Sequence, residues 1–364
     1  MSKHKTLGQV FTPKWIVDEI LNLVGYNGAA ILDKYILEPA SGNGVFLVEI
    51  VKRYISACLD NDIETREIIE RLEKYVYAVE IDPIEHKKSI QILNDLVKEN
   101  LDIQKNINWK IYNQSTLDFY RNYLNYFDFV VGNPPYIRIH NLDLNTRETL
   151  KQDFLFSEGT IDIYLSFFEM GIKMLKSNGC LGYITPNSYL HNSSYGLFRD
   201  YLKKEKRIKT LIDFKANKLF NGFSTYTAIT IIHKNYSDNF FEYKELINNK
   251  IEFVNKVRFD SLNKKDWSFT NTENEFFLAD LEKGKNSTIK DFFDVQYGFA
   301  TRRDKIFVGK CQNYNEDLVY FNGRLVEKDI LKKVVKGSKF KGNIDENEKI
   351  LFPYELENKK CKFN

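Results

Sequence analysis

The sequence has few cysteines and no long apolar run. Its four cysteines, Cys58, Cys180, Cys311 and Cys361, form no C-x-x-C pair, and none has a histidine at metal-ligand spacing. The sequence therefore predicts reduced thiols and no metal site. No apolar run approaches the roughly 18 residues of a membrane helix, and the basic start leads into no apolar signal segment. We accordingly expect a cytoplasmic protein with no membrane partner.

An excess of one charge is also missing. Lysine and arginine total 53 and aspartate and glutamate 50, so the formal net charge is only +3, which does not by itself predict nucleic-acid binding. The basic residues are clustered, however, at 203–209, 302–305 and 332–341. Such clusters are typical of phosphate-binding surfaces and, about equally, of solvated helix faces. A chain of 364 residues with 43% hydrophobic residues is long enough for two globular domains.

Apolar patterns of strand and helix type alternate along most of the chain. Thr12 followed by Pro13 predicts a helix start with Thr12 as the N-cap. Strands are predicted at 35–37, 75–79, 109–112, 127–131, 181–184, 210–214 and 227–233, and helices at 45–59, 63–74, 84–99, 161–176 and 195–206. This alternation is typical of an α/β fold, with a mixed, mainly parallel sheet and helices on both faces.

A shift to polar composition at 235–239 predicts a domain boundary. The residues that follow are richer in lysine, asparagine and aromatics, with short strand patterns and few clear helices. We therefore expect one domain at 1–237 and a smaller α+β domain at 238–364. The chain stops soon after 350–354 without an evident closing element, so we expect the second domain to be incomplete.

The most informative stretch is Asn133-Pro134-Pro135-Tyr136, which follows the predicted strand at 127–131. Open α/β sheets bind their ligands at the carboxyl ends of such strands. The two prolines lack N–H donors and fix their own φ angles, and the first of them keeps Asn133 out of the helical region. The motif therefore presents an amide oxygen, at least one carbonyl and an aromatic ring, which suits a planar amine. In isolation it would be better explained as a proline-rich turn capped by a core tyrosine.

The loop after the first strand contains Gly42-x-Gly44, which allows close approach of a ligand to the backbone. A dinucleotide-binding fingerprint requires a third glycine where this chain has Leu47, and a P-loop requires a lysine that is missing here. The glycine loop alone is therefore weak support for any one ligand.

Polar residues also follow the second and third strands. Glu80 ends the second strand, where a carboxylate can accept both hydroxyl protons of a ribose; the alternative is an ordinary exposed glutamate. Ser115 or Asp118, after the third strand, could bond the amino group of an adenine, and spacing alone does not choose between them. Together these loops predict a pocket for an adenosine-bearing molecule without a strong demand for phosphate, which fits S-adenosyl-L-methionine.

Four ordered motifs resemble the gamma group of N6-adenine DNA methyltransferases, the Taq-type modification enzymes of restriction systems. They are Gly-Gln-Val-Phe-Thr-Pro at 8–13, Leu-Glu-Pro-Ala-Ser-Gly-Asn-Gly at 37–44, Val-Glu-Ile-Asp-Pro at 79–83 and Gly-Asn-Pro-Pro-Tyr at 132–136. The resemblance covers residues 8 to about 235 and continues more loosely at 295–298 and 352–354. It implies a Rossmann-like S-adenosylmethionine-dependent methyltransferase domain, followed by the N-terminal part of a DNA target-recognition domain.

The resemblance also implies a role for each motif residue. The methionine part of the cofactor would contact Thr12 and the Glu38-Pro39-Ala40 turn, with Gly42 and Gly44 in the adjoining loop. Glu80 would bind the ribose and Ile81 the face of the adenine. Ser115 stands where the family usually has an aspartate for the cofactor's adenine, which leaves that contact open.

The target adenine would be held at the second motif. Asn133 and Pro134 would accept hydrogen bonds from its N6 amine, Pro135 would border both ligands, and Tyr136 would stack on the flipped base. Phe220 matches the second aromatic wall of the family, with Phe223 as the alternative, because this loop is one residue longer. We interpret the nearby Asp128 and His140 as structural.

This combination predicts an enzyme that methylates N6 of adenine in double-stranded DNA, since two acceptors can draw the amine hydrogens without a strong base. A methyltransferase acting on an RNA base or a glutamine amide, and a non-catalytic nucleic-acid-binding subunit, are the alternatives. We expect a monomer, with a cognate restriction endonuclease or a separate specificity part as possible protein partners. We expect no nuclease before residue 8, so cleavage would need a further C-terminal part or another chain.

Overall fold

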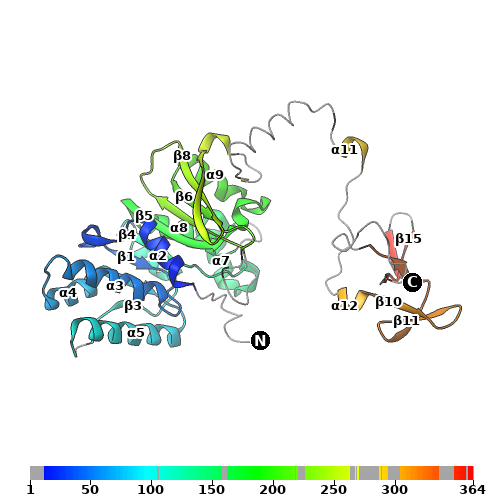
Figure 1. Cartoon of the computed structure of the whole chain (residues 1–364), viewed down its shortest axis with the longest axis horizontal. Coiled ribbons are helices and arrows are strands. Elements are labelled where there is room, and N and C mark those ends of the chain that lie inside the picture. The colour runs from blue at the N-terminus through cyan, green and yellow to red at the C-terminus, as the bar shows by residue number, and fades with distance from the viewer. Residues whose placement is uncertain are drawn as a thin grey trace. The chain divides into compact units, whose positions relative to one another are not determined.

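A computed structural model describes residues 12–104, 106–157, 162–217, 219, 226–262, 267, 269, 287, 289–293, 304–335, 348–357 and 360–363. The chain forms two compact units, Met1–Lys283 and Gly284–Asn364, which are considered separately (Figure 1). Among the described residues, no helix is both long enough and apolar enough to span a bilayer.

The first unit is built on a nine-stranded sheet with the order β3-β2-β1-β4-β5-β7-β6-β8-β9. Its strands are β1 Ile36–Glu38, β2 Val76–Val79, β3 Lys110–Tyr112, β4 Phe127–Gly132, β5 Leu175–Pro186, β6 Ile208–Asp213, β7 Thr227–His233, β8 Phe240–Ile247 and β9 Lys250–Arg258. Strands β3, β2, β1, β4 and β5 are mutually parallel, whereas β7 runs antiparallel to both β5 and β6. The predicted α/β class with a mixed, mainly parallel sheet is confirmed.

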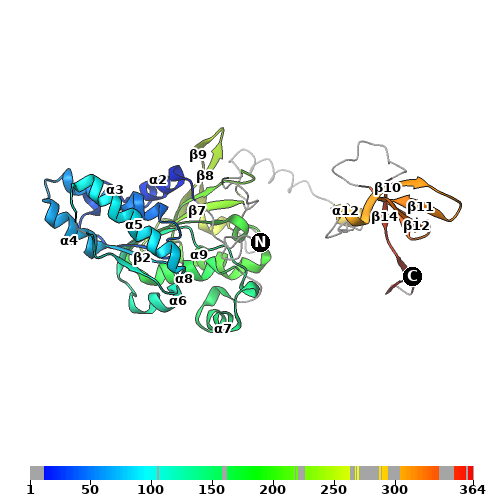
Figure 2. The same cartoon turned by 90° about the horizontal axis from the view of Figure 1, so that it is seen from below.

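Helices cover both faces of this sheet (Figures 1 and 2). They are α2 Lys14–Leu23, α3 Val45–Leu59, α4 Thr65–Tyr75, α5 Pro83–Leu101, α6 Thr116–Phe119, α7 Leu144–Asp153, α8 Tyr164–Met174 and α9 Gly196–Glu205. Successive residues of β2 belong to two separate cores. Val76 and Ala78 lie in the core that contains the buried residues of α2 to α5, whereas Tyr77 and Val79 lie in the core that contains those of α8 and α9. Every residue of β1 and β2 is buried, as expected for parallel strands between helical layers.

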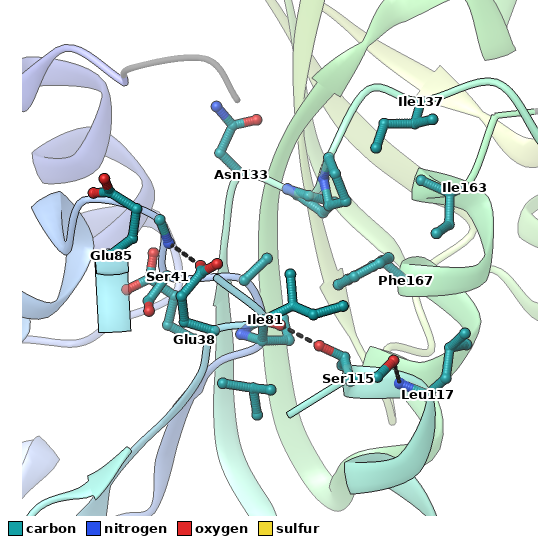
Figure 3. Close-up of a pocket in the computed structure, with 18 of the residues that line it drawn as sticks. Glu38, Ser41, Ile81, Glu85, Ser115, Leu117, Asn133, Ile137, Ile163 and Phe167 are labelled. Atoms are coloured by element: carbon teal, nitrogen blue, oxygen red, sulfur yellow. Dashed lines mark hydrogen bonds between the residues drawn. The ribbon is translucent and has the colours of Figure 1, made fainter. Parts of the chain in front are cut away.

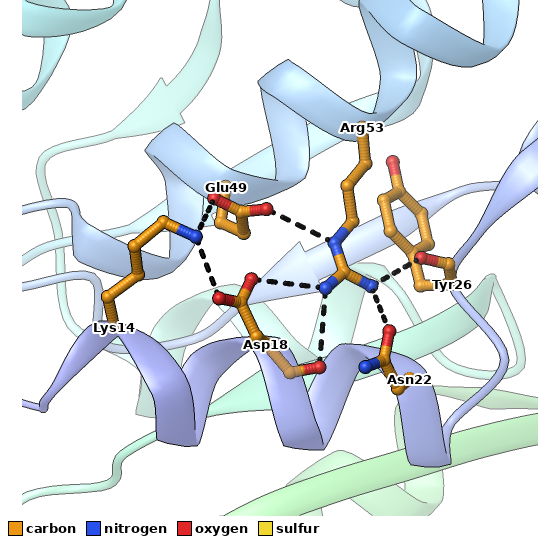
Figure 4. A network of polar contacts seen from close by, with 6 residues as sticks. All are labelled: Lys14, Asp18, Asn22, Tyr26, Glu49 and Arg53. Atoms are coloured by element: carbon orange, nitrogen blue, oxygen red, sulfur yellow. Dashed lines mark hydrogen bonds and ion pairs between the residues drawn. The ribbon is translucent and has the colours of Figure 1, made fainter.

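A polar network fixes α2 against α3 (Figure 4). The guanidinium of Arg53 donates to the Asn22 side chain at 2.8 Å, to the Tyr26 carbonyl at 3.2 Å and to the Asp18 carboxylate at 3.1 Å. Because α2 follows Thr12 directly, this network also fixes where Thr12 lies relative to the loop that precedes α3.

Two local expectations were wrong. Thr12 is not the N-cap of α2: Pro13 occupies that position, and no side chain caps the helix. Residues 177–179 were expected to separate a helix from a strand beginning at 181, but they lie inside β5, which starts at Leu175. Leu175 pairs with Phe127 of β4 and Cys180 with Phe129, so the register shifts between these pairs and residues 176–179 form an irregularity inside the strand.

The sheet also continues past the expected domain boundary at 237/238. Strand β8 pairs with β6, and its Phe241 and Tyr243 side chains are buried in the core of the first unit. The polar stretch at 235–239 is therefore the connection between β7 and β8, and the structural division falls between Lys283 and Gly284.

The described part of the second unit is mainly β. Its five-stranded antiparallel sheet has the order β12-β11-β10-β14-β13, and β15 and β16 form a separate pair. The strands are β10 Val308–Asn313, β11 Leu318–Phe321, β12 Arg324–Glu327, β13 Leu331–Lys333, β14 Glu348–Leu351, β15 Tyr354–Glu357 and β16 Lys360–Phe363, with short helices α11 Ile289–Phe292 and α12 Asp304–Phe307.

Candidate active site

A cavity of about 280 Å³ lies at the carboxyl ends of four adjacent strands, β3, β2, β1 and β4. This volume is near the lower end of the roughly 300–1,000 Å³ typical of small-molecule pockets. Eleven residues that we singled out from the sequence line it: Thr12, Glu38, Pro39, Ala40, Gly42, Glu80, Ile81, Ser115, Asn133, Pro134 and Pro135. They are spread over more than 120 positions of the chain, and the parallel strand order brings them to one edge.

Asn133 is held in place by Thr12. The Asn133 amide nitrogen donates to Thr12 Oγ1 at 3.0 Å, and only 7% of Thr12 is exposed. An amide whose nitrogen donates on one side presents its oxygen on the other, so this bond sets the direction of the Asn133 oxygen. The preceding Gly132 has φ of +156°, and a Cβ there would be in ordinary contact with Glu38 Cγ and Pro39 Cδ, each at 3.6 Å.

Glu80 is fixed by the backbone at both carboxylate oxygens. Oε2 accepts from the Gly42 N–H at 2.6 Å, and Oε1 accepts from the Asp82 N–H at 2.8 Å. Burial raises the pKa of Glu80 above its ordinary value, and these two hydrogen bonds oppose that rise. Each oxygen has a second lone pair that can accept a further hydrogen bond.

Glu38 is more deeply buried, with 2% of the residue exposed. Burial raises the pKa of its carboxyl well above the usual range, the nearby charge of Glu80 raises it further, and a hydrogen bond from the Leu47 backbone opposes both effects. Figure 3 shows Glu38, Ser41 and Glu85 on one side of the pocket and apolar Ile137, Ile163 and Phe167 on the other.

Of the two candidates after β3, only Ser115 lines the pocket. Its hydroxyl oxygen caps α6 by accepting from the Leu117 N–H at 3.2 Å. Asp118 is exposed and is not among the lining residues. The neighbouring Thr116 hydroxyl donates to the Pro39 carbonyl, which ties the loop after β3 to the loop after β1.

Three other candidate residues lie elsewhere. Gly44 does not line the pocket: it is the N-cap of α3 in a left-handed conformation, with φ of +78°. Tyr136 does not line it either; its hydroxyl donates to the Ile184 carbonyl at 3.4 Å, and burial raises its pKa. Phe220 and Phe223 lie outside the described residues.

The structure adds pocket residues that sequence reasoning missed. Glu85 lies in the first turn of α5. Ile163 directly precedes α8, and Phe167 lies in the first turn of that helix. An apolar helix face gives no sign of whether it packs on the core or borders a cavity, so the sequence offered no signal for Phe167. Asp128, which we interpreted as structural, accepts from the Tyr35 N–H at 2.9 Å and from Lys176 Nζ at 2.7 Å.

The described residues contain no group of histidine, cysteine, aspartate and glutamate side chains arranged to hold a metal ion.

Comparison with known proteins shows which family the chain resembles. Residues 46–220 match the family described as Eco57I restriction-modification methylase. Among curated members of restriction-modification systems, the Type II methyltransferase M.BstVI of Geobacillus stearothermophilus is 25% identical over 264 residues, which cover 68% of this chain and 46% of the relative. The Type II methyltransferase M.PaeR7I of Pseudomonas aeruginosa is 29% identical over 235 residues, covering 62% of this chain and 40% of the relative. The chain thus spans less than half the length of these methylases.

Solved structures of restriction-modification enzymes share the fold. The cryo-electron microscopy structure of a DrdV–DNA complex matches with a TM-score of 0.58 and 16% identity, covering 84% of this chain and 36% of that one. A nuclease-deletion mutant of the Type ISP enzyme LlaGI, in complex with a DNA substrate mimic, matches with a TM-score of 0.56 and 17% identity, covering 74% and 28%. At this identity the likeness shows the fold alone.

Proposed function

We propose that this protein is a site-specific DNA methyltransferase that transfers a methyl group from S-adenosyl-L-methionine to N6 of a flipped adenine in double-stranded DNA. It would serve as the modification enzyme of a restriction-modification system. The observation that carries the proposal is that Asn133 and Pro134 line the same cavity as Glu80 and the Gly42 loop. An amine-binding motif and an adenosine-type pocket thus share one space.

The residues present fit this cofactor. The described lining includes four acidic residues, Glu38, Glu80, Glu85 and Asp143, and no lysine, arginine or histidine. Such a lining would repel the phosphates of a dinucleotide or of ATP and would attract the sulfonium and ammonium groups of S-adenosylmethionine. Glu80 has a lone pair left on each oxygen for the two ribose hydroxyls.

The remaining cofactor contacts follow from the same lining. Thr12 and the Glu38-Pro39-Ala40 turn would border the methionine part. Ile81, Pro135 and the residues of the apolar wall would enclose the adenine ring, with the Ser115 hydroxyl near its amino group. Gly44 would act indirectly, by shaping the turn into α3. When bound, the cofactor supplies an electrophilic methyl group on a sulfonium centre.

The chain's own residues would then prepare the acceptor. An exocyclic adenine amine is a poor nucleophile because its lone pair is delocalised into the ring. The Asn133 amide oxygen, directed by Thr12, and the Pro134 carbonyl would accept its two hydrogens and localise the lone pair on nitrogen. The adenine has to leave the duplex to reach them. Stacking on Tyr136 and Phe220 would offset part of that cost, at roughly 1–3 kcal/mol per stacked base.

DNA is favoured as the substrate because two proteins of the same fold were solved with DNA or a DNA mimic and because curated relatives are Type II methyltransferases. An RNA base or a glutamine amide would suit the same acceptor pair. We further propose that Gly284–Asn364 begins the target-recognition domain, that the protein acts as a monomer in the cytoplasm, and that a restriction endonuclease or a separate specificity part is its partner.

Asn133→Ala tests the mechanism. This variant loses the directed amide oxygen, so methyl transfer to DNA should be abolished, while calorimetric binding of S-adenosylmethionine should remain within a few-fold of wild type. Tritium transfer from labelled cofactor would be measured with DNA and, in parallel, with RNA. Turnover at the wild-type rate in Asn133→Ala would refute the mechanism, and transfer to RNA alone would refute the proposed substrate. Methylome sequencing of a host expressing the protein would then give the recognition site.

A further inference from the structure

Glu38 is a buried acid with an unused oxygen. Only 2% of the residue is exposed, and its Oε2 atom has no hydrogen-bond partner. A Cβ built on Gly132, the residue that leads into Asn133, would lie 3.6 Å from Glu38 Cγ, so the two segments are neighbours. The carboxyl therefore lines the cofactor cavity directly beside the proposed site of methyl transfer.

No positive charge among the described residues neutralises this acid. From β2 it faces Glu80, a second carboxylate, and from α3 it faces the Leu47 backbone N–H. The segments at Thr12 and Asn133 contribute only neutral groups, and α5 contributes Glu85, which is paired with Lys88 at 2.7 Å. The lining itself holds no lysine, arginine or histidine.

Ionising such a group is unfavourable in the ligand-free protein. A carboxylate removed from water loses its hydration, and a second carboxylate nearby adds repulsion. Both effects act in the same direction, and both raise the pKa of Glu38. A cation placed in the cavity would reverse the balance, because it supplies the missing counter-charge at Oε2.

We propose that Glu38 determines the preference of the pocket for a cationic ligand by exchanging its own proton for the positive charge of the cofactor. This proposal rests on the proposed methyltransferase function only in taking S-adenosylmethionine as the cationic ligand. In the exchange, protonated Glu38 and the cationic ligand become a carboxylate–cation pair, and one proton passes to the buffer. Cofactor affinity consequently rises with pH over the range in which free Glu38 holds its proton.

Calorimetric titration of the full chain measures this proton directly. The binding enthalpy is measured at each pH, from about pH 5 to about pH 9, in buffers of different ionisation enthalpy. At each pH, the slope of binding enthalpy against buffer ionisation enthalpy gives the number of protons released. For wild type we expect about one proton per S-adenosylmethionine at the maximum of this profile. Zero release across the range would overturn the proposal without recourse to any variant.

Two variants locate the source of the proton. Glu38→Gln should lose the proton release and bind S-adenosylmethionine roughly tenfold or more weakly, because a charge-assisted contact is lost. The matched control is Glu85→Gln. Glu85 lines the same cavity, but its carboxylate is already neutralised by Lys88, so proton release in this variant should equal that of wild type. Undiminished release in Glu38→Gln would overturn the assignment, and thermal melting verifies that each variant is folded.

Three ligands distinguish the cation involved. S-adenosylmethionine carries a sulfonium and an ammonium group, S-adenosylhomocysteine carries the ammonium alone, and 5′-methylthioadenosine carries neither. If only S-adenosylmethionine causes proton release, Glu38 pairs with the sulfonium. If S-adenosylmethionine and S-adenosylhomocysteine both cause it, Glu38 pairs with the ammonium group. Equal release with methylthioadenosine would overturn the exchange. Failure of the wild type to bind any of the three would overturn the proposed function as well, whereas binding without Glu38-dependent release would overturn only the role of Glu38.

Discussion

Replacing Thr12 by valine should slow methyl transfer by removing one hydrogen bond. The two side chains have nearly the same shape, so the change deletes the acceptor of the Asn133 amide and little else. The bond is 3.0 Å long, and Thr12 is 7% exposed, so water has poor access to replace the lost acceptor. The Asn133 amide would then lose its hydrogen bond to Thr12, and this bond would no longer set the direction of the amide oxygen.

The size of the effect follows from the cost of the lost partner. Leaving a buried donor unsatisfied costs about 1–3 kcal/mol. If the Asn133 oxygen is required only in the transition state, that energy appears in the barrier, and the rate falls about 5- to 150-fold. Thr12 also borders the proposed cofactor site, so the measurement has to separate binding from chemistry.

Single-turnover methyl transfer at saturating cofactor and DNA provides that separation, with cofactor affinity measured independently by calorimetry. Thr12→Ser is the matched control, since it keeps the hydroxyl that accepts from Asn133 and should retain most of the wild-type rate. A Thr12→Val protein with the wild-type single-turnover rate would show that the Asn133 orientation does not depend on Thr12. Equal losses in Thr12→Ser and Thr12→Val would show that the hydroxyl is not the relevant group.

Two stability predictions follow from the same region. Gly44→Ala should lower the free energy of unfolding in urea by roughly 1–2 kcal/mol or more, because φ is +78° and the new Cβ would lie 3.1 Å from Ser89 Oγ. Gly25→Ala is its control, because Gly25 has a similar φ of +81° but open space where the Cβ would lie. Cofactor affinity would be measured for both variants, and a loss restricted to Gly44→Ala would trace to the Ser89 contact. Glu38→Gln should melt at a higher temperature than wild type, and the difference in melting temperature should grow as pH rises above 4.5, the ordinary pKa of a glutamate. The folded state holds the Glu38 proton more tightly than the unfolded state, so wild-type stability falls from that pH up to the raised folded pKa; a margin independent of pH would contradict this reasoning.

Local patterns in the sequence were sufficient for much of the fold. Helix α3 occupies the predicted residues 45–59, because a glycine turn and a continuous apolar face define it without distant partners. Strand β7 likewise occupies the predicted residues 227–233. Four ordered motifs were enough to indicate a resemblance to the methylases, and three of them lie at the ends of β1, β2 and β4, which parallel strands bring to one edge.

Tertiary structure decided what each motif residue contacts. Thr12 had the local signature of an N-cap, yet its hydroxyl bonds Asn133 instead, a partner 121 residues away. Strand β5 begins earlier than predicted because Leu175 already pairs with Phe127 of β4, and β8 extends the sheet beyond a polar stretch that resembled a boundary. The burial of Glu38 beside Glu80, and the absence of a cation from the described lining, also depend on packing between distant segments. Sequence reasoning succeeds where neighbouring residues fix the outcome, and it fails where hydrogen bonds and charges are completed by residues that only the folded chain brings together.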